Sequence, residues 1–100
     1  MGKELANNFL RKLRNDIAID HLIENILEIP CKYSEGYFRF LCPICLEFNT
    51  SVKKQTNLAR CFRCKRNFNP IDMVMVVNNL SFIDTVKFLK PLLYHTKRIN

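Results

Sequence analysis

Four of the five cysteines in the 100-residue chain stand in two matching pairs. Cys42 and Cys45 form one Cys-x-x-Cys pair, Cys61 and Cys64 form the other, and fifteen residues separate the pairs. One such turn places two sulfur atoms on one side of a metal ion, and a second turn completes the tetrahedron that Zn2+ prefers. The spacing therefore predicts one Zn2+ ion bound by four thiolates. Because four thiolates leave no position for a water molecule, we expect a structural rather than a catalytic site.

Other chemistries also use cysteine, and each makes a different demand on the chain. The N-terminus has no apolar secretory signal, so we expect a cytoplasmic, reducing location, where disulfides rarely persist. A thioredoxin-type motif uses one such pair beside a βαβ unit, and no such unit is visible. An iron–sulfur cluster takes four thiolates too, and the spacing alone does not distinguish it from zinc. Cys31 stands apart from the pairs and is expected to be a free or buried thiol.

The basic charge is concentrated on the cysteine segment. The chain has a net charge of +7, and residues 39–66 contain seven basic residues against one acid, Glu47. Cations on a small sheet can contact phosphates, and exposed aromatic rings can stack on unpaired bases. We therefore expect this segment to bind nucleic acid. The candidate residues are Arg39, Lys53, Lys54, Arg60, Phe62, Arg63, Lys65 and Arg66.

Three more aromatic residues precede the first cysteine pair and are candidates for stacking: Tyr37, Phe38 and Phe40. In a domain of this size, however, most aromatic side chains pack the core. The sequence leaves both roles open for these three residues.

Helical periodicity predicts helices over residues 4–13 and 16–27, with Asp16 as the N-cap of the second. It returns at residues 69–79, where Asn69 precedes a proline at the first helical position. A last helix is expected to begin at Ser81, in a sequence like a capping box, and to bend or end at Pro91. Its predicted buried stripe is Ile83, Val86, Leu89 and Leu93.

Short β-rich segments fill the middle of the chain and predict strands at residues 37–41, 49–54 and 58–62. A turn signal at residues 34–36 precedes the first of them. The strands are short and their connections are tight, so an antiparallel meander is the economical arrangement. The expected fold class is α+β: a small zinc ribbon with a short antiparallel sheet, flanked by N- and C-terminal helices.

Several function classes do not fit the sequence. The longest unbroken apolar run, Met73 to Val77, is far shorter than the ~20 residues that span a bilayer, so we expect no membrane partner. A chain with two glycines has no glycine-rich phosphate loop. No nucleophile and base stand at a catalytic spacing. We therefore expect the chain not to be an enzyme on its own.

The order of these motifs resembles the zinc-binding domain of bacterial replicative, DnaG-type DNA primases. The resemblance covers about residues 16–93 and includes the leading helix, both cysteine turns and two closing helices. It implies a helical extension at residues 1–15 and a primase-like zinc-binding domain at 16–100. Cys45 stands where the family usually has histidine, and Lys65 begins a stretch where glycines are expected.

In that family the domain is a template-reading module that helps to position single-stranded DNA for the first step of priming. The resemblance implies single-stranded DNA as a partner. No catalytic primase domain follows in this sequence, so we expect an accessory subunit that acts in trans on a polymerase, primase or helicase chain. The abundance of Asn, Lys and Ile hints at an AT-rich source such as a mobile element.

Two other functions stay open from the sequence. In the first, the chain is a protein–protein adaptor whose apolar helix residues dock a partner, while zinc only holds the fold. The residues that would dock are Phe9, Leu10, Leu13, Phe88, Leu89, Leu92 and Leu93. In the second, the chain is a transcription-type zinc ribbon that binds RNA polymerase or duplex DNA.

Overall fold

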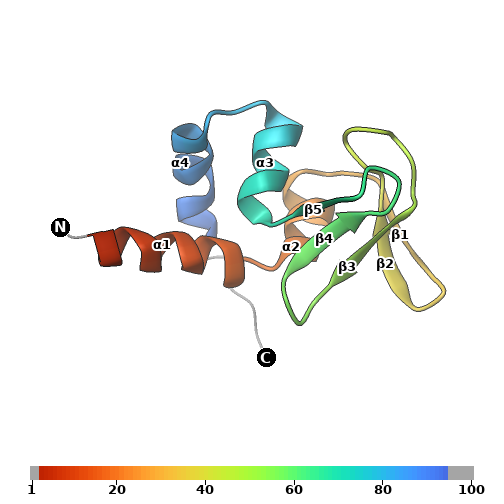
Figure 1. Cartoon of the computed structure of the whole chain (residues 1–100), viewed down its shortest axis with the longest axis horizontal. Helices are drawn as coiled ribbons and strands as arrows, with labels where there is room; N and C mark the ends of the chain where they lie inside the picture. Colours follow the sequence, from red (N-terminus) through yellow and green to blue (C-terminus); the bar gives the residue numbers. More distant parts are fainter. Residues whose placement is uncertain (1–2, 95–100) are drawn as a thin grey trace.

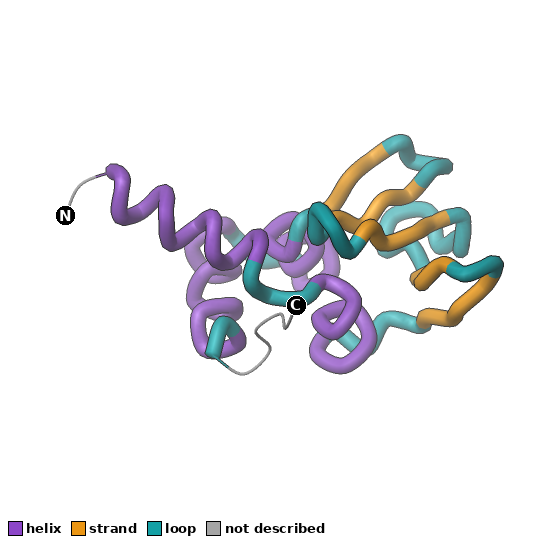
Figure 2. The backbone as a smooth tube through the Cα atoms, turned by 90° about the horizontal axis from the view of Figure 1, so that it is seen from below, coloured by secondary structure: helices purple, strands orange, loops and turns teal. Residues whose placement is uncertain are grey.

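The computed structural model describes residues 3–94, and these form a helical half and a β half (Figure 1). Viewed from below, the strands gather at the end of the molecule opposite the N-terminus (Figure 2). The helices are α1 (Lys3–Asn15), α2 (Ile19–His21), the π-helical segment η1 (Leu22–Ile26), α3 (Pro70–Asn78) and α4 (Phe82–Leu92). The strands are β1 (Cys31–Ser34), β2 (Tyr37–Phe40), β3 (Thr50–Lys53), β4 (Leu58–Cys61) and β5 (Arg66–Phe68). The predicted α+β class is confirmed.

β1 and β2 form an antiparallel hairpin with Ser34 opposite Tyr37. Glu35 and Gly36 between them have φ angles of 56° and 81°. Two left-handed residues in a two-residue loop make a type I′ turn, which suits the twist of the flanking strands. The turn and β2 were predicted from the sequence, whereas β1 was not. None of the four β1 residues is fully buried, so its sequence shows no alternation of apolar and polar residues.

The second sheet is an antiparallel meander in the order β3-β4-β5. Its inner face carries buried side chains, including Val52 and Ala59, while the alternate residues point outward. This confirms two of the three predicted strands and their antiparallel pairing. The expected single meander of all three is wrong, because the first cysteine turn separates β2 from β3 and β2 pairs with β1 instead. β5 was not predicted, because only Phe68 of its three residues is buried.

The second predicted helix is shorter than expected, and its predicted start at Asp16 is wrong. The helix begins at Ile19, and Ala18 at the N-cap provides no side-chain hydrogen bond. The amide oxygen of Asn57, from the β3–β4 turn, accepts from the Ile19 N–H at 3.0 Å. A side chain distant in the sequence therefore accepts the hydrogen bond that an N-cap side chain would normally accept. A local sequence pattern does not reveal such a contact.

The two C-terminal helices begin where the sequence predicts. Asn69 and Asp72 form a reciprocal capping box at α3, and Ser81 accepts from the Asp84 N–H at α4. α4 ends at Leu92, one residue beyond Pro91. The predicted stripe is wrong at Ile83, which is 66% exposed. Thr85 takes the buried position instead, because it lies one turn before Leu89, which packs in the helical core.

The buried side chains form two clusters. The ribbon core lies under the sheets and contains Ile19, Ile23, Ile29, Phe38, Phe40, Cys42, Val52, Ala59, Cys61, Phe68 and Met73. The helical core contains Leu13, Ile17, Leu22, Ile71, Val74, Leu89 and Leu93. α3 contributes to both clusters, and α1 contributes Leu13 to the second. The division at residues 15/16 stays a prediction.

The apolar helix residues of the adaptor hypothesis pack inside the molecule. Leu13, Leu89 and Leu93 are buried, and the others pack against the helical core as partly buried side chains. They therefore stabilise the fold in this structure. No helix within residues 3–94 is long and apolar enough to cross a bilayer.

Candidate metal centre and nucleic-acid interface

The four paired cysteines converge on one point between the two sheets. The Sγ atoms of Cys42 and Cys64 lie 3.8 Å apart, those of Cys45 and Cys61 lie 3.6 Å apart, and all four lie within 4.8 Å of one another. A tetrahedron with metal–sulfur bonds of about 2.3 Å has sulfur atoms roughly 3.8 Å apart. The donor set therefore fits one tetrahedral ion, and all four thiols are free.

The backbone of each turn supports a charged sulfur. The N–H of Ile44 donates to Cys42 Sγ at 3.4 Å, and the N–H of Cys64 donates to Cys61 Sγ at 3.3 Å. Burial alone would raise the pKa of Cys61, but the Cys64 N–H and the neighbouring thiols lower it to about 7. Burial and the same thiols raise the pKa of Cys64 to about 12. A divalent cation would displace the protons that the cluster retains.

Cys31 does not belong to the cluster, which confirms the expectation of a free thiol. It is half-buried on β1, at the edge of the ribbon core. Burial and the neighbouring Glu24 carboxylate raise its pKa. Cys31 is therefore a half-buried thiol that lies outside the candidate metal site.

The residue after each cysteine turn has a left-handed backbone. Leu46 has a φ of 60° and Lys65 a φ of 55°. Glycine adopts this conformation freely, while a residue with a side chain incurs a strain of about 1 kcal/mol or more. This explains why the primase resemblance implies glycine near position 65. In this protein both positions carry a long side chain, Leu46 and Lys65, despite the backbone strain.

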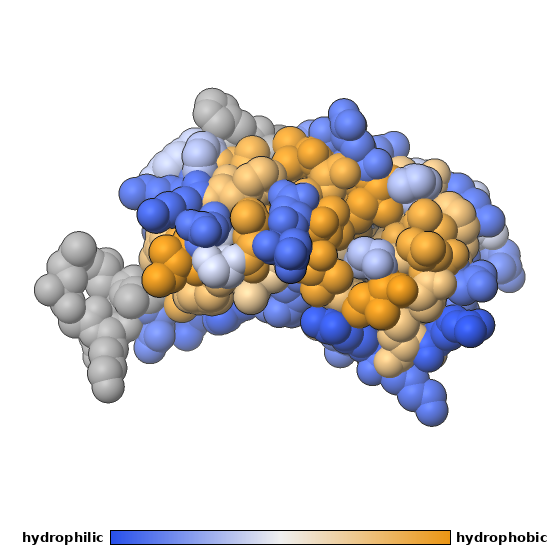
Figure 3. Space-filling view, turned by 90° about the horizontal axis from the view of Figure 1, so that it is seen from above, coloured by the Kyte–Doolittle hydropathy of each residue, from blue (hydrophilic) through white to orange (hydrophobic). Residues whose placement is uncertain are grey.

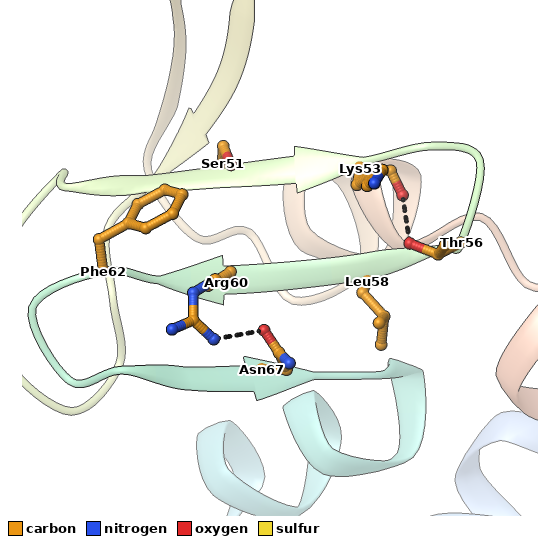
Figure 4. Close-up of a pocket in the computed structure, with 7 residues that line it drawn as sticks. All are labelled: Ser51, Lys53, Thr56, Leu58, Arg60, Phe62 and Asn67. Carbon is orange, nitrogen blue, oxygen red and sulfur yellow. Dashed lines mark hydrogen bonds between the residues drawn. The ribbon is translucent and has the colours of Figure 1, made fainter.

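Strand alternation divides the predicted nucleic-acid residues between different surfaces. Lys53, Arg60 and Phe62 lie on the outward side of the second sheet, around a shallow hollow of about 410 Å³ (Figure 4). The Arg60 guanidinium donates to Asn67 Oδ1 at 2.9 Å and lies 5.6 Å from the Phe62 ring centroid. We call this surface the outer sheet face; it consists of Ser51, Lys53, Thr56, Leu58, Arg60, Phe62 and Asn67. Asn67 was not predicted, because β5 was not.

A second hollow adjoins the outer sheet face and shares Ser51 and Phe62 with it. Its other walls include Tyr37, which is 55% exposed, and Arg39. Arg39 donates to the Thr50 carbonyl at 2.8 Å, so it fastens β2 to β3. One side-chain nitrogen of Arg39, a predicted nucleic-acid contact, is therefore already used in a hydrogen bond between the two sheets.

Phe38 and Phe40, the two other stacking candidates, are 4% and 0% exposed. They belong to the ribbon core, so of the two roles that the sequence left open for them the structure shows core packing. β2 alternates, and its inward positions are the ones that these two residues occupy. Tyr37 is the first residue of β2 and remains accessible.

The remaining cations lie elsewhere. Lys54 forms an ion pair with Asp20 of α2 at 3.6 Å. Arg63 and Lys65 are exposed on the second cysteine turn. Arg66 stands opposite Cys61 in the β4–β5 register, on the other side of the sheet from Arg60. The eight predicted residues therefore do not form one continuous surface.

Comparison with known families agrees with the cysteine geometry. The family model for the CHC2 zinc finger, the DnaG-type zinc ribbon, matches residues 5–98. The match extends through α1, beyond the start of the primase resemblance at residue 16. A search of curated proteins finds no match.

Proposed function

The chain belongs to the CHC2 zinc-finger family of the DnaG type, and from this premise we propose that it binds single-stranded DNA as a zinc-stabilised accessory subunit in the initiation of DNA synthesis. The family is that of a zinc-binding primase domain, which implies a role linked to nucleic acid or replication. The metal is Zn2+, held by four thiolates in a closed structural site.

The observation that carries the proposal is the chemistry of the outer sheet face. It offers two cations, Lys53 and Arg60, beside a half-exposed ring, Phe62, in one open hollow. Cations can follow a phosphate backbone, and a ring can stack on a base that has no pairing partner. In a duplex the faces of the bases are already stacked on one another, so the ring favours single strands.

The closed metal site supports the accessory role. A four-thiolate ion has no open position for substrate or water, so it supplies shape and not catalysis. The chain would then present the template to a polymerase, primase or helicase chain that performs the chemistry. Lys54, Arg63, Lys65 and Arg66 lie outside the outer sheet face and stay predicted only as weaker, peripheral contacts for nucleic acid.

Fluorescence anisotropy with labelled oligo(dT) and with a matched duplex tests the DNA-binding proposal. We expect tighter binding to the single strand, with a loss of affinity between about 50 and 200 mM salt that reflects the phosphate contacts. Phe62→Ala should weaken binding by about tenfold, which corresponds to one base stack of ~1–3 kcal/mol. Phe82→Ala is the matched control, because the two rings are 45% and 46% exposed and Phe82 lies on α4.

Charge reversal provides a second, independent readout. Lys53→Glu combined with Arg60→Glu should abolish measurable binding and flatten the salt dependence. Lys87→Glu combined with Lys90→Glu changes net charge equally, at exposed positions of α4, and should cost far less. Equal losses in both double variants would mean that net charge, not the outer sheet face, governs binding. Preference for the duplex would refute the template role.

A further inference from the structure

We propose that the tip of the metal centre docks an acidic, aliphatic segment of a partner protein, at a site separate from the outer sheet face. The metal tip consists of Ile44 and Leu46 from the first cysteine turn and Arg63 and Lys65 from the second. The inference rests on the proposed function in one respect: the partner is the chain that carries out DNA synthesis. The surface itself is argued from the geometry of the two turns.

The two turns form one surface because they hold the same sulfur cluster. Ile44 lies between two of the clustered cysteines and Arg63 between the other two, and all four Sγ atoms lie within 4.8 Å. In Figure 1 the two turns lie at the upper side of the β half, away from the N-terminus of α1. Ligand binding by Cys42, Cys45, Cys61 and Cys64 therefore fixes the relative positions of the tip residues.

The apolar part of the metal tip lies outside both hydrophobic cores. Ile44 is 46% exposed and Leu46 is 66% exposed, and neither belongs to the ribbon core. Leu46 also occupies a left-handed backbone position that glycine would adopt without strain. A strained residue that exposes a large apolar side chain to water points to a contact made outside the chain. Figure 3 shows apolar surface reaching the β half, bordered by hydrophilic side chains.

The charged part of the metal tip determines which kind of segment fits. Arg63 and Lys65 are exposed, and no carboxylate lies within 4.0 Å of either one among the side chains that the structure describes, those of residues 7–94. Glu47 is the single acid among residues 39–66. Four thiolates and one Zn2+ contribute −2 beneath the tip, and Glu47 follows Leu46, so the tip is not positive as a whole. The exposed side chains of Arg63 and Lys65, next to aliphatic ones, are what complements a segment that carries carboxylates and aliphatic side chains.

The same features argue for protein over nucleic acid at this end. Ile44 and Leu46 have no rings, so they offer no platform for base stacking. The rings and cations suited to a single strand lie on the outer sheet face instead, around Phe62 and Arg60. The molecule therefore has one surface suited to DNA and another suited to protein.

Site-specific photo-crosslinking in the native host tests the docking surface. A photoreactive leucine analogue is placed at position 46 of the full chain and, as a control, at position 83. Leu46 and Ile83 are both 66% exposed, but Ile83 lies on α4. We expect a nuclease-resistant product at position 46 that is at least tenfold weaker at position 83. Mass spectrometry should map it to an acidic, aliphatic segment of a protein that synthesises or unwinds DNA.

Charge reversal at the tip separates this inference from the DNA-binding proposal. Arg63→Glu with Lys65→Glu should abolish the crosslink, while oligo(dT) affinity falls by less than about threefold. Loss of oligo(dT) binding in this variant, with the crosslink intact, would make the metal tip a DNA site and overturn the inference. A product with DNA, with a second copy of the chain, or of equal yield at position 83 would also overturn it, as would no product. Wild-type protein that crosslinks as expected but ignores oligo(dT) would refute only the DNA-binding proposal.

Discussion

The helical half and the β half are stabilised in different ways. The strands contain three or four residues each, below the usual five or six, so each sheet contributes few hydrogen bonds. Two cysteine ligands, Cys42 and Cys61, are fully buried in the ribbon core, which makes the metal part of that core. The helical core is made of aliphatic side chains and contains no metal ligand. We infer that the metal supplies the stability that longer strands would otherwise give to the β half. It has no direct role in stabilising the helical half.

The two halves are nevertheless joined by specific contacts. Asn57, at the β3–β4 turn, donates to the carbonyls of Arg14 and Ile17 at 2.6 and 2.7 Å. Met73 of α3 packs in the ribbon core, while its neighbour Val74 packs in the helical core. Damage in one half should therefore reach the other through a few identifiable residues.

The largest effect is expected from loss of a metal ligand. Cys61→Ser should lose the metal and unfold the β half, because binding free energies of about 10–16 kcal/mol in small zinc domains are folding free energies. That range matches or exceeds the whole stability of a typical domain, about 5–15 kcal/mol. Elemental analysis measures the metal, and amide NMR signals of β3 and α4 report separately on the two halves.

Cys31→Ser is the matched control for that variant. Cys31 is a half-buried thiol outside the cluster, so its serine variant should keep one ion per chain. If Cys61→Ser stayed folded and metal-loaded, the ligand assignment would be wrong. If the α4 signals were lost as completely as those of β3, the inference that the metal has no direct role in the helical half would be wrong.

A cavity in the helical core should lower the stability of the protein without loss of the metal, which is the opposite of the effect expected for Cys61→Ser. Leu13 is 0% exposed, so Leu13→Ala should lower the free energy of unfolding by about 2–5 kcal/mol. The metal content should not change, because no ligand lies in this core. Denaturant titration with parallel elemental analysis measures both. Lys12→Ala, one residue earlier and exposed, should change the stability by less than about 0.5 kcal/mol.

The contact between the halves is tested at Asn57. Asn57→Gly keeps the left-handed backbone but removes the amide that binds Ile19, Arg14 and Ile17, which should cost about 2–3 kcal/mol. Asn79→Gly is the control: Asn79 has a similar φ of 52° but is exposed at the end of α3. In the Asn57 variant, chelation should unfold the β half with less effect on the helices than in wild type. An equal loss of stability at both positions would attribute the effect to glycine itself.

The sequence predicted the metal ligands and most of the helices, because their signals are local. A Cys-x-x-Cys pair forms its own turn, and Asn69 and Ser81 cap the helices that follow them directly. The helix at residues 16–27 was predicted less well, since its start depends on Asn57, nearly forty residues away. Local patterns do not contain such a contact.

The nucleic-acid residues were predicted as a group, but their division between surfaces was not. The pairing register places Arg60 and Asn67 on one side of the sheet and Arg66 on the other. A one-residue shift in register would exchange these sides, and the sequence did not indicate β5 at all. Which cations share a surface is therefore decided by tertiary structure, although the excess of positive charge is visible in composition.

The smallest predicted effect is a gain in stability confined to the helical half. Thr85 is 0% exposed on α4, and its hydroxyl has no hydrogen-bond partner among the described residues. Thr85→Val keeps the shape and removes the unsatisfied group, so the free energy of unfolding should rise by about 1 kcal/mol. Thr85→Ser keeps the hydroxyl and loses the methyl group, so it should lower stability instead. Thermal unfolding measures both changes, with a shift in melting temperature of roughly 4–8 °C per kcal/mol. If the helical half is stable without metal, the gain in stability of Thr85→Val should persist when a chelator is present.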